Sequence, residues 1–173
     1  MIITGVAGGG KTTLINALRQ YGFSCVPEVA REVIADQIAI GGRALHQLDP
    51  ELFAEIMLSW EVRSYRQAAH LAGLVFFDRG IPDLVGYHRL MGLPVPVHVL
   101  AATTIYRYDP QVFLAPPWPE IYVPDEERTQ GFDEVMRTHE VIANAYLEHG
   151  YDLITLPKVS VEERVAFVRQ HLT

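Results

Sequence analysis

The chain has 173 residues, of which 49% are hydrophobic and 20% are charged, and its formal net charge is −7. This length and composition predict one soluble domain, and a negative balance without any Lys/Arg run argues against an extensive nucleic-acid surface. Cys25, the only cysteine, excludes an intramolecular disulfide, and without an 18-residue apolar run or a signal peptide we expect a cytoplasmic protein with no membrane span.

Short apolar runs alternate with helix-length patterns along the whole chain. The predicted strands are residues 1–4, 23–26, 74–78, 111–115 and 152–156. The predicted helices span about residues 11–21, 28–40, 50–72, 82–91, 96–106, 131–149 and 160–172. This alternation implies right-handed crossovers and a parallel sheet that is covered on both faces. Because ligands bind such sheets beyond the carboxyl ends of the strands, the polar residues after each strand are the candidate functional residues.

The first predicted strand runs into a phosphate-binding motif. Residues 5–12 read G-V-A-G-G-G-K-T and match G-x-x-x-x-G-K-[ST] between an apolar strand and a helical pattern. Glycines allow successive backbone N–H groups to surround a polyphosphate at the start of a helix. Lys11 is expected to reach the β- and γ-phosphates, and the Thr12 hydroxyl is expected to bind Mg²⁺. The predicted nucleotide-binding residues are Gly8, Gly9, Gly10, Lys11, Thr12 and Thr13.

The second predicted strand is followed by P-E-V-A-R, in which Glu28 stands at the strand end and Arg31 one helical turn later. Glu28 is a candidate to take a proton from an acceptor hydroxyl, and Arg31 is a candidate to pair with a phosphate or with the acceptor. The alternative is a glutamate that favours a helix N-terminus, together with a surface arginine.

The third predicted strand ends in Asp78-Arg79-Gly80. An acid at the end of a buried strand can orient Mg²⁺-bound water or accept a proton, so Asp78 is a candidate for both tasks. Arg79 is a candidate bidentate clamp on an acceptor or phosphate. Asp83 and Tyr87 share a helix face and are candidates to line an acceptor pocket. The alternative is a capping aspartate with its arginine partner and a solvated helix face.

The fourth predicted strand leaves the sheet through A-P-P-W-P, a rigid exit in which Trp118 either covers a flat ligand or packs in the core. A charged segment between Pro and Gly residues follows, and we predict a lid segment at about 119–131. Arg128 in this segment is the candidate to close over the transferring phosphate. An exposed salt-bridged residue is the alternative interpretation of Arg128, and Arg107 is a weaker candidate for the lid role.

The fifth predicted strand is followed by a loop within reach of the base of a bound nucleotide, which gives Pro157 and Val159 a possible base contact. Ser160 and Glu163 have the spacing of a capping box at the start of the last helix. The histidines are scattered and form no ligand cluster, so we expect no structural zinc.

The motifs G-x-x-x-x-G-K-T-T, P-E-x-x-R, F-D-R-G-x-x-D, A-P-P-W, D-x-x-R and G-Y-x-L-x-x-L-P together resemble the small AAA-like predicted ATPase/kinase family of P-loop proteins. That family is similar to the ribosylnicotinamide kinase domain and, more broadly, to nucleoside and nucleotide kinases. The resemblance covers essentially the whole chain. It implies a three-layer α/β P-loop NTPase fold with a five-stranded parallel sheet in the order 2-3-1-4-5 and helices on both faces.

The resemblance also implies roles for individual residues. Gly10, Lys11 and Thr12 correspond to positions that bind phosphate and Mg²⁺. Glu28 falls where deoxynucleoside kinases carry a carboxylate near the acceptor hydroxyl, and Asp78-Arg79 match the D/E-R pair of nucleoside and thymidylate kinases. Arg128 falls where such kinases carry a mobile lid. Val6-Ala7 replaces the Gly-Pro of many members, and only one clear lid arginine is present. The resemblance therefore does not determine the acceptor specificity.

These observations favour an ATP-dependent kinase that binds a nucleoside triphosphate, Mg²⁺ and a small-molecule acceptor. The predicted catalytic residues are Lys11, Asp78, Glu28 and Arg128. The predicted substrate-binding residues are Glu28, Arg31, Arg79 and Asp83, and the predicted metal-binding residues are Thr12 and Asp78. The alternatives are a P-loop NTPase that hydrolyses ATP or GTP as a regulatory switch, and a nucleotide-binding scaffold without chemistry. Acceptor identity, the choice between ATP and GTP, and the oligomeric state stay open.

Overall fold

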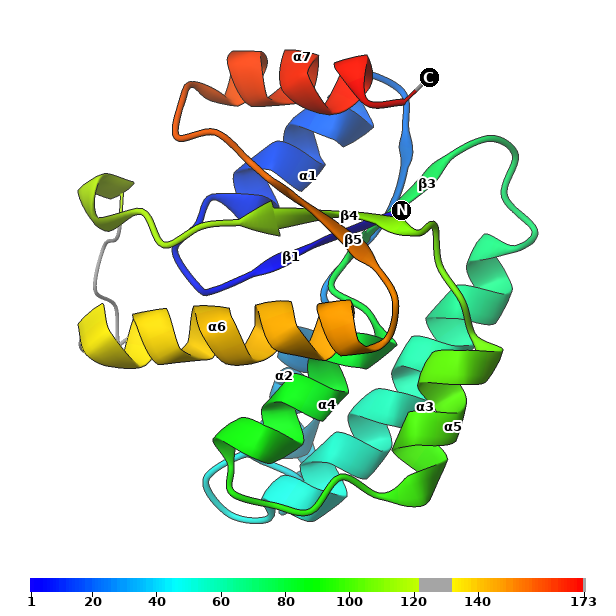
Figure 1. Cartoon of the computed structure of the whole chain (residues 1–173). Coiled ribbons are helices and arrows are strands. Elements are labelled where there is room, and N and C mark those ends of the chain that lie inside the picture. Colours follow the sequence, from blue (N-terminus) through cyan, green and yellow to red (C-terminus); the bar gives the residue numbers. More distant parts are fainter. Residues whose placement is uncertain (122–131, 173) are drawn as a thin grey trace.

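The computed structural model of the protein describes residues 1–121 and 132–172 (Figure 1). Its centre is a five-stranded sheet in the order β2-β3-β1-β4-β5, in which each neighbouring pair is parallel. The strands are β1 (Ile2–Gly5), β2 (Ser24–Val26), β3 (Val75–Asp78), β4 (Gln111–Ala115) and β5 (Asp152–Thr155). The fold class and the strand order predicted from the sequence are therefore confirmed.

Helices cover both faces of this sheet. They are α1 (Lys11–Gln20), α2 (Val29–Ile40), α3 (Pro50–Ala68), α4 (Ile81–Leu90), α5 (Val97–Ile105), α6 (Phe132–Glu148) and α7 (Val161–Gln170), with a 3-10 turn at Pro119–Ile121. Helices α1 and α7 lie on one face, and α2 to α6 lie on the other (Figure 1). Most of the predicted lid segment, with Arg128, lies outside the described residues.

The central strand β1 shows why the sheet needs two helical layers. Ile2 and Ile3 are both fully buried although consecutive side chains on a strand point to opposite faces. Ile2 packs in the cluster formed with α2 to α6, whereas Ile3 packs with Leu18 of α1 and Val168 of α7. A strand buried on both sides is a continuous apolar run, which is the pattern of a parallel sheet.

The sheet gathers the predicted functional segments along one edge. In the parallel register Gly5 stands beside Ala115, and both are the last residues of their strands. The phosphate-binding loop, Glu28, Arg79, Trp118 and Ser160 each follow a different strand at this carboxyl edge. At the far end of that series, Ser160 and Glu163 form the predicted capping box of α7.

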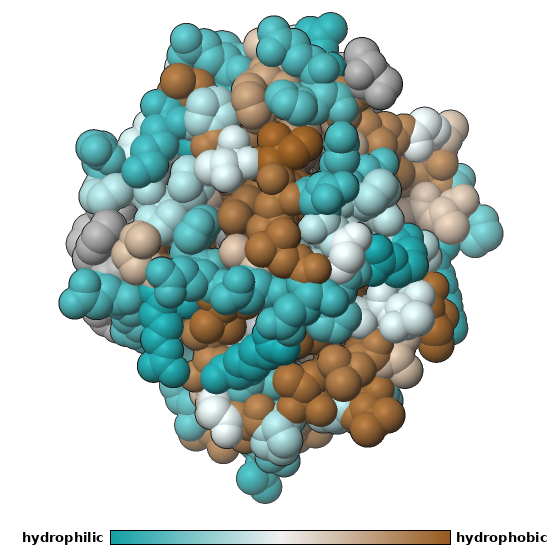
Figure 2. All heavy atoms as spheres, viewed as in Figure 1, coloured by the Kyte–Doolittle hydropathy of each residue, from teal (hydrophilic) through white to brown (hydrophobic). Residues whose placement is uncertain are grey.

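Exposed apolar side chains gather on α5, where Val97 is 82%, Ile105 is 68% and Leu100 is 40% exposed. Figure 2 shows apolar surface at the lower right of the molecule, where α5 lies in Figure 1. This surface is remote from the carboxyl edge of the sheet and does not shape the site described below. Within the described ranges, no helix combines the length and hydropathy that crossing a bilayer requires.

Candidate functional site

The loop between β1 and α1 has a backbone that requires glycine at several positions. Gly8 and Gly10 adopt left-handed conformations, with φ of 77° and 78°. At Gly5, where φ is 128°, a Cβ atom would stand 2.3 Å from the carbonyl oxygen of Ala115. Gly10 is the N-cap of α1 and offers no side chain to the first N–H groups of the helix. These N–H groups are therefore free to bind an anion in front of the loop.

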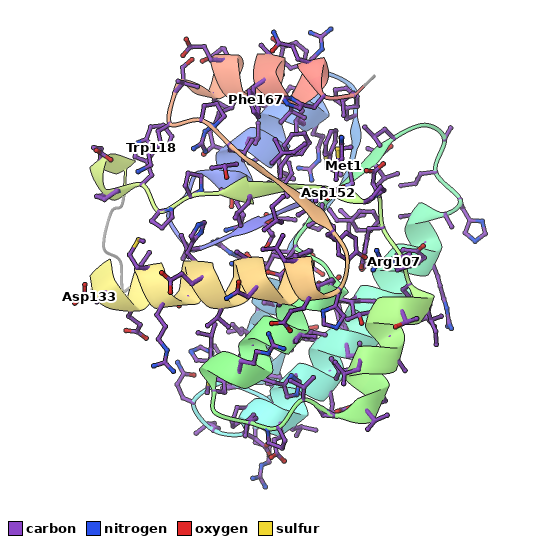
Figure 3. The ribbon with its side chains drawn as sticks, viewed as in Figure 1. Met1, Arg107, Trp118, Asp133, Asp152 and Phe167 are labelled. Carbon is purple, nitrogen blue, oxygen red and sulfur yellow. The ribbon has the colours of Figure 1, made fainter. Side chains whose placement is uncertain are left out.

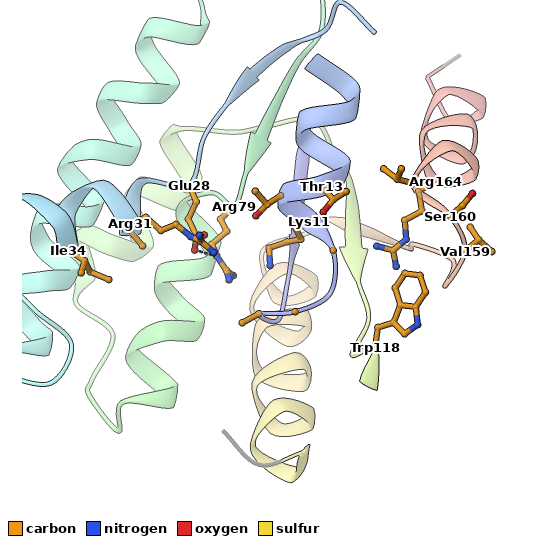
Figure 4. A pocket seen from close by; sticks show the side chains of 16 residues that line it. Lys11, Thr13, Glu28, Arg31, Ile34, Arg79, Trp118, Val159, Ser160 and Arg164 are labelled. Atoms are coloured by element: carbon orange, nitrogen blue, oxygen red, sulfur yellow. Dashed lines mark hydrogen bonds and ion pairs between the residues drawn. The ribbon is translucent and has the colours of Figure 1, made fainter. Parts of the chain in front are cut away.

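A cavity of about 590 Å³ opens in front of this loop (Figure 4). The predicted residues that line it are Gly8, Gly10, Lys11, Thr12, Thr13, Glu28, Arg31 and Arg79. Gly9, Asp78 and Asp83 are buried and are not among the residues that line it. The structure thus brings most of the predicted phosphate-binding and acceptor-binding residues to one cavity. Arg31 and Arg79 lie on one side of the loop, and Trp118 lies on the other side (Figure 4).

Lys11 is buried at the floor of the loop, where its Nζ donates to the carbonyl oxygens of Gly5 at 3.0 Å and Val6 at 2.8 Å. Burial, together with the positive charge of Arg79, lowers the pKa of Lys11 to about 8. Lys11 is therefore mostly charged at neutral pH and lies at the loop where the sequence predicts phosphate binding. The neighbouring Thr12 is exposed on the cavity side.

Glu28 and Arg79 form the acidic and basic pair at the opposite side of the cavity. Arg79 Nε donates to Glu28 Oε1 at 2.7 Å, and Arg31 Nε stands 3.4 Å from Glu28 Oε2. Burial raises the pKa of Glu28, but the positive charges of Arg79 and Lys11 outweigh burial and bring this pKa to about 2. Glu28 is therefore an ionised carboxylate, oriented by two guanidinium groups.

Arg79 has an unusual backbone that its partners stabilise. Among the described residues it is the one non-glycine residue with a positive φ, of 75°. Besides Glu28, its guanidinium contacts the Gly5 carbonyl at 3.0 Å and Asp83 Oδ1 at 3.2 Å. Such a left-handed conformation costs free energy and persists where surrounding contacts fix it, often at functional sites.

Asp83 is buried beneath Arg79 rather than exposed to the cavity. Its carboxylate accepts hydrogen bonds from the Thr4 hydroxyl at 2.6 Å, from the Gly80 N–H at 3.0 Å and from the Tyr146 hydroxyl. With these donors and Arg79 it has four partners in this conformation. A direct contact between Asp83 and an acceptor stays a prediction, and what the structure places is a support for Arg79.

Asp78 ends β3 directly behind the loop and is 6% exposed. Burial raises the pKa of Asp78 above its ordinary value, and the charge of Lys11 opposes this change. Its Oδ1 is buried and has no hydrogen-bond partner in the described part of the chain. A carboxylate oxygen with free acceptor capacity beside a phosphate loop fits a Mg²⁺-bound water, since Mg²⁺ keeps several waters and takes few protein ligands.

Two arginines differ from the sequence interpretation. Arg107 donates to the His149 carbonyl and stacks on Tyr151, which precedes β5, so it lies at the amino edge of the sheet. Figure 3 shows Arg107 and Trp118 at opposite ends of the sheet. The prediction of Arg107 as an alternative lid arginine is therefore wrong. Arg164, which we did not single out, lines the cavity on the Trp118 side.

Arg164 has contacts that join three distant segments. Its guanidinium donates to the carbonyls of Pro157 and Gly9 and stacks 4.5 Å above the Trp118 ring. A sequence signal for it exists, because Arg164 falls among the apolar positions of α7 that face the sheet. Val159 lines the cavity as well, whereas Pro157 contributes its carbonyl to Arg164.

The parallel sheet order and the phosphate loop after β1 define a P-loop protein with the kinase type of fold. Residues 1–164 match the AAA_28 family, described as AAA domain, and the chain belongs to this family. No curated protein matches the sequence.

Solved structures share this fold at low sequence identity. Deoxyadenosine kinase from M. mycoides, with products dCMP and a flexible dCDP bound, is 15% identical with a TM-score of 0.70, over 99% of this chain and 98% of that one. Thymidylate kinase from Ehrlichia chaffeensis is 14% identical with a TM-score of 0.67, over 100% of this chain and 98% of that one. The NadR protein in complex with NR is 19% identical with a TM-score of 0.69, over 98% of this chain and 50% of that one.

Proposed function

We propose that this protein is an ATP-dependent phosphotransferase of one domain, which acts in the cytoplasm on a small-molecule acceptor such as a nucleoside, a nucleotide or a related metabolite. One observation carries the proposal: a single cavity holds a phosphate loop and, facing it, the ionised carboxylate of Glu28 between Arg31 and Arg79. A hydrolase needs a group that orients water, whereas this arrangement suits a hydroxyl or phosphate acceptor. The similar kinases named above support the same class.

The residues of the chain suit the separate tasks of phosphoryl transfer. The loop N–H groups and Lys11 bind the phosphates of the donor and place positive charge beside the γ-phosphoryl group. Thr12 and, through water, Asp78 would hold Mg²⁺, which supplies charge neutralisation on the phosphate oxygens when it is bound with the nucleotide.

Glu28 acts on the acceptor side as an orienting group. With a pKa of about 2 it is ionised throughout the physiological range, and it accepts a hydrogen bond from the acceptor hydroxyl. As the bond from acceptor oxygen to phosphorus forms and the bond from the leaving oxygen to phosphorus breaks, the hydroxyl proton moves toward the carboxylate. A weak base is sufficient because the transition state of phosphoryl transfer is loose. Arg79 and Arg31 hold Glu28 and present positive charge to the acceptor.

The experiment that tests this function measures ATP consumption with Mg²⁺ against a panel of nucleosides, nucleotides and related cofactors. We expect low turnover without an acceptor and a sharp rise with one compound or a closely related group of compounds. The Lys11→Ala protein should show no turnover under either condition. Vigorous hydrolysis that no acceptor changes would instead identify a nucleotide hydrolase, and ATP binding without any turnover would identify a scaffold.

A further inference from the structure

The side chain of Arg164 is a buried cation whose observed partners are neutral. It is 2% exposed. Its Nε donates to the Pro157 carbonyl at 2.7 Å, and its Nη1 donates to the Gly9 carbonyl at 2.7 Å. Across residues 1–121 and 132–172 no carboxylate forms an ion pair with it, and its buried Nη2 has no hydrogen-bond partner.

A buried charge that lacks a counter-charge is costly, and a buried N–H that lacks an acceptor adds to the cost. Burial lowers the pKa of Arg164, which is the direction expected for a cation without a nearby anion. Two carbonyl groups and the face of Trp118 offset part of this cost. Arg79, at the other side of the same cavity, is held by the carboxylates of Glu28 and Asp83. Among the described residues Arg164 therefore lacks the counter-charge that Arg79 has.

The position of Arg164 connects that charge to the phosphate loop. Its partner Gly9 stands between two left-handed glycines and packs against the end of β4, where an added Cβ would lie 3.1 Å from Ala115 Cβ. Arg164 of α7 therefore holds the Gly9 carbonyl of the loop, while the end of β4 packs against Gly9. Figure 4 shows its guanidinium group directed toward the loop, with the Trp118 ring beside it.

We propose that Arg164 is a positioning residue of the phosphate loop, which holds the loop through the Gly9 carbonyl and whose buried charge is balanced by the polyphosphate that the loop binds. The inference rests on the proposed function to the extent that the loop must bind a triphosphate. It goes further by assigning the recognition of phosphate, independent of the nucleobase, to a residue 155 positions away from Gly9 in the sequence.

The test uses inorganic tripolyphosphate, which has no base or ribose, beside ATP, each with Mg²⁺ in titration calorimetry. We expect Arg164→Gln to weaken the binding of both ligands by roughly tenfold or more, as the loss of a charged hydrogen-bonding group predicts. Arg164→Lys keeps the charge but not the fork of donors, and should recover part of the affinity. The matched control is Arg169→Gln, an exposed arginine on the same helix, which should bind both ligands like the wild type.

Trp118 provides a spectroscopic readout that separates this role from a purely structural one. The readout is the change in Trp118 emission when tripolyphosphate is added, which a purely structural role of Arg164 does not predict. The chain has two tryptophans, so Trp60→Phe leaves Trp118 as the sole indole emitter. We expect tripolyphosphate to change the emission of the Trp60→Phe protein, because the anion acts on the guanidinium group stacked on the ring. In the Trp60→Phe/Arg164→Gln protein this change should be absent.

Three outcomes would overturn the inference. If folded Arg164→Gln bound tripolyphosphate like the wild type but bound ATP more weakly, Arg164 would contact the base or ribose instead. Unchanged binding of both ligands would leave Arg164 a brace of the fold. If Arg164→Gln did not fold, wild-type affinity of Arg164→Lys for tripolyphosphate would count against the inference, since the single Nζ of lysine cannot reproduce the separate Nε and Nη1 donors that hold the Pro157 and Gly9 carbonyls. Failure of the proposed function looks different, because the wild type would then bind ATP without transferring phosphate to any acceptor.

Discussion

Lys11 of the phosphate-loop motif lies in an environment that is unfavourable to its charge. Its ammonium group is buried and close to the positive charge of Arg79, and these two effects lower its pKa to about 8. The carbonyls of Gly5 and Val6 hold it in place without supplying a negative charge. A phosphate group in the loop would supply that charge and raise the pKa again. On the proposed function we therefore predict that the affinity for nucleotide depends on pH in a range that is accessible to experiment.

We expect the affinity for Mg-ATP to be nearly constant from pH 6.5 to 7.5 and to fall above pH 8. The sign follows from linkage: a group whose pKa is higher in the complex contributes its full binding energy below its pKa in the free protein and loses it as pH rises, by at most about tenfold per pH unit. Calorimetry between pH 6.5 and 9.5 measures this. Lys11→Met should bind weakly and without the decline, and an equal decline in that variant would contradict the assignment to Lys11.

Glu28 offers a second test at the scale of one residue. Glu28→Gln keeps the size of the side chain and removes the charge that, in the proposed mechanism, orients the acceptor, so kcat with the acceptor should fall by about 10² to 10⁴-fold. The affinity for ATP should change little, because the proposed function assigns Glu28 to the acceptor and not to the donor nucleotide. Steady-state kinetics with the identified acceptor measure both quantities. Glu32→Gln, one turn further along α2 and exposed, is the control, and a kcat loss of equal size there would remove Glu28 from the mechanism.

At the scale of elements, the sequence predicted strands and helices because each repeats a short local pattern. All five predicted strands overlap the observed ones, and the spacing of Ser160 and Glu163 predicted the capping box of α7. The phosphate loop was predictable for the same reason, since its constraints act within residues 5–12. The positions of Glu28, Arg31 and Arg79 after predicted strands were sufficient to predict that they lie near that loop, and all three line the same cavity.

Side-chain partners that are distant in the sequence were not predictable in this way. Asp83 pairs with Tyr146, 63 positions away, and this contact helps to bury a residue that the helix pattern presented as part of a pocket. Arg164 pairs with Gly9 across 155 positions. Arg107 stands after a helix rather than after a strand, which places it at the opposite edge of the sheet. Periodicity determines which face a residue occupies, whereas packing between elements determines what that face meets.

The contact between β1 and β4 gives a test at this scale. Gly5→Ala places a Cβ atom 2.3 Å from the Ala115 carbonyl oxygen and also strains a φ of 128°, so we expect a loss of about 4 kcal/mol or more in the free energy of unfolding. Denaturant unfolding measures it. Gly22→Ala is the matched control, because its φ of 94° is also positive but no atom lies within 4 Å. The control should lose about 1 kcal/mol, and equal losses would show that β4 contributes nothing.

At the scale of the whole molecule, Asp83 ties together segments from three parts of the chain. Its carboxylate joins Thr4 of β1, Gly80 before α4 and Tyr146 of α6, and it also supports Arg79. All of its partners donate hydrogen bonds to it, so the site requires an acceptor with two oxygens. Its removal should affect stability and the acceptor side of the cavity together.

We expect Asp83→Asn to lower the free energy of unfolding by about 2 to 4 kcal/mol, because the amide NH₂ would face donors and Arg79 would lose a charge partner. Kinetics of the folded fraction should show a lower kcat as well. Asp36→Asn, an exposed aspartate on α2, should stay within about 0.5 kcal/mol of the wild type. A loss below 1 kcal/mol for Asp83→Asn would show that the network is not a unit of stability.

Glu61 of α3 links the pH of the solution to the stability of the whole fold. It is 4% exposed, and burial, followed by the negative charge of Asp83, raises its pKa to about 8. The other charged groups that act on it are Arg79, which follows β3, Glu28, which precedes α2, and Asp78, which ends β3. Around neutral pH the folded protein therefore carries a protonated Glu61, whereas the unfolded chain carries an ionised one.

A folded state that binds more protons than the unfolded state loses stability as pH rises. The contribution of Glu61 is fully present below its ordinary pKa of 4.5 and falls up to pH 8, by at most about 1.4 kcal/mol per pH unit. Asp78, whose pKa is also raised, acts in the same direction. The lowered pKa of Lys11 makes stability rise with pH above pH 8. The lowered pKa of Glu28 makes stability rise with pH below pH 4.5. The lowered pKa of the Met1 amino group, about 6, acts in the opposite direction between pH 6 and 8, so the test is the difference between two proteins: in denaturant unfolding at pH 5 to 8 the stability of the wild type should fall more steeply, or rise less, than that of Glu61→Gln. An identical slope in both proteins would mean that Glu61 ionises in the fold as easily as it does in the unfolded chain.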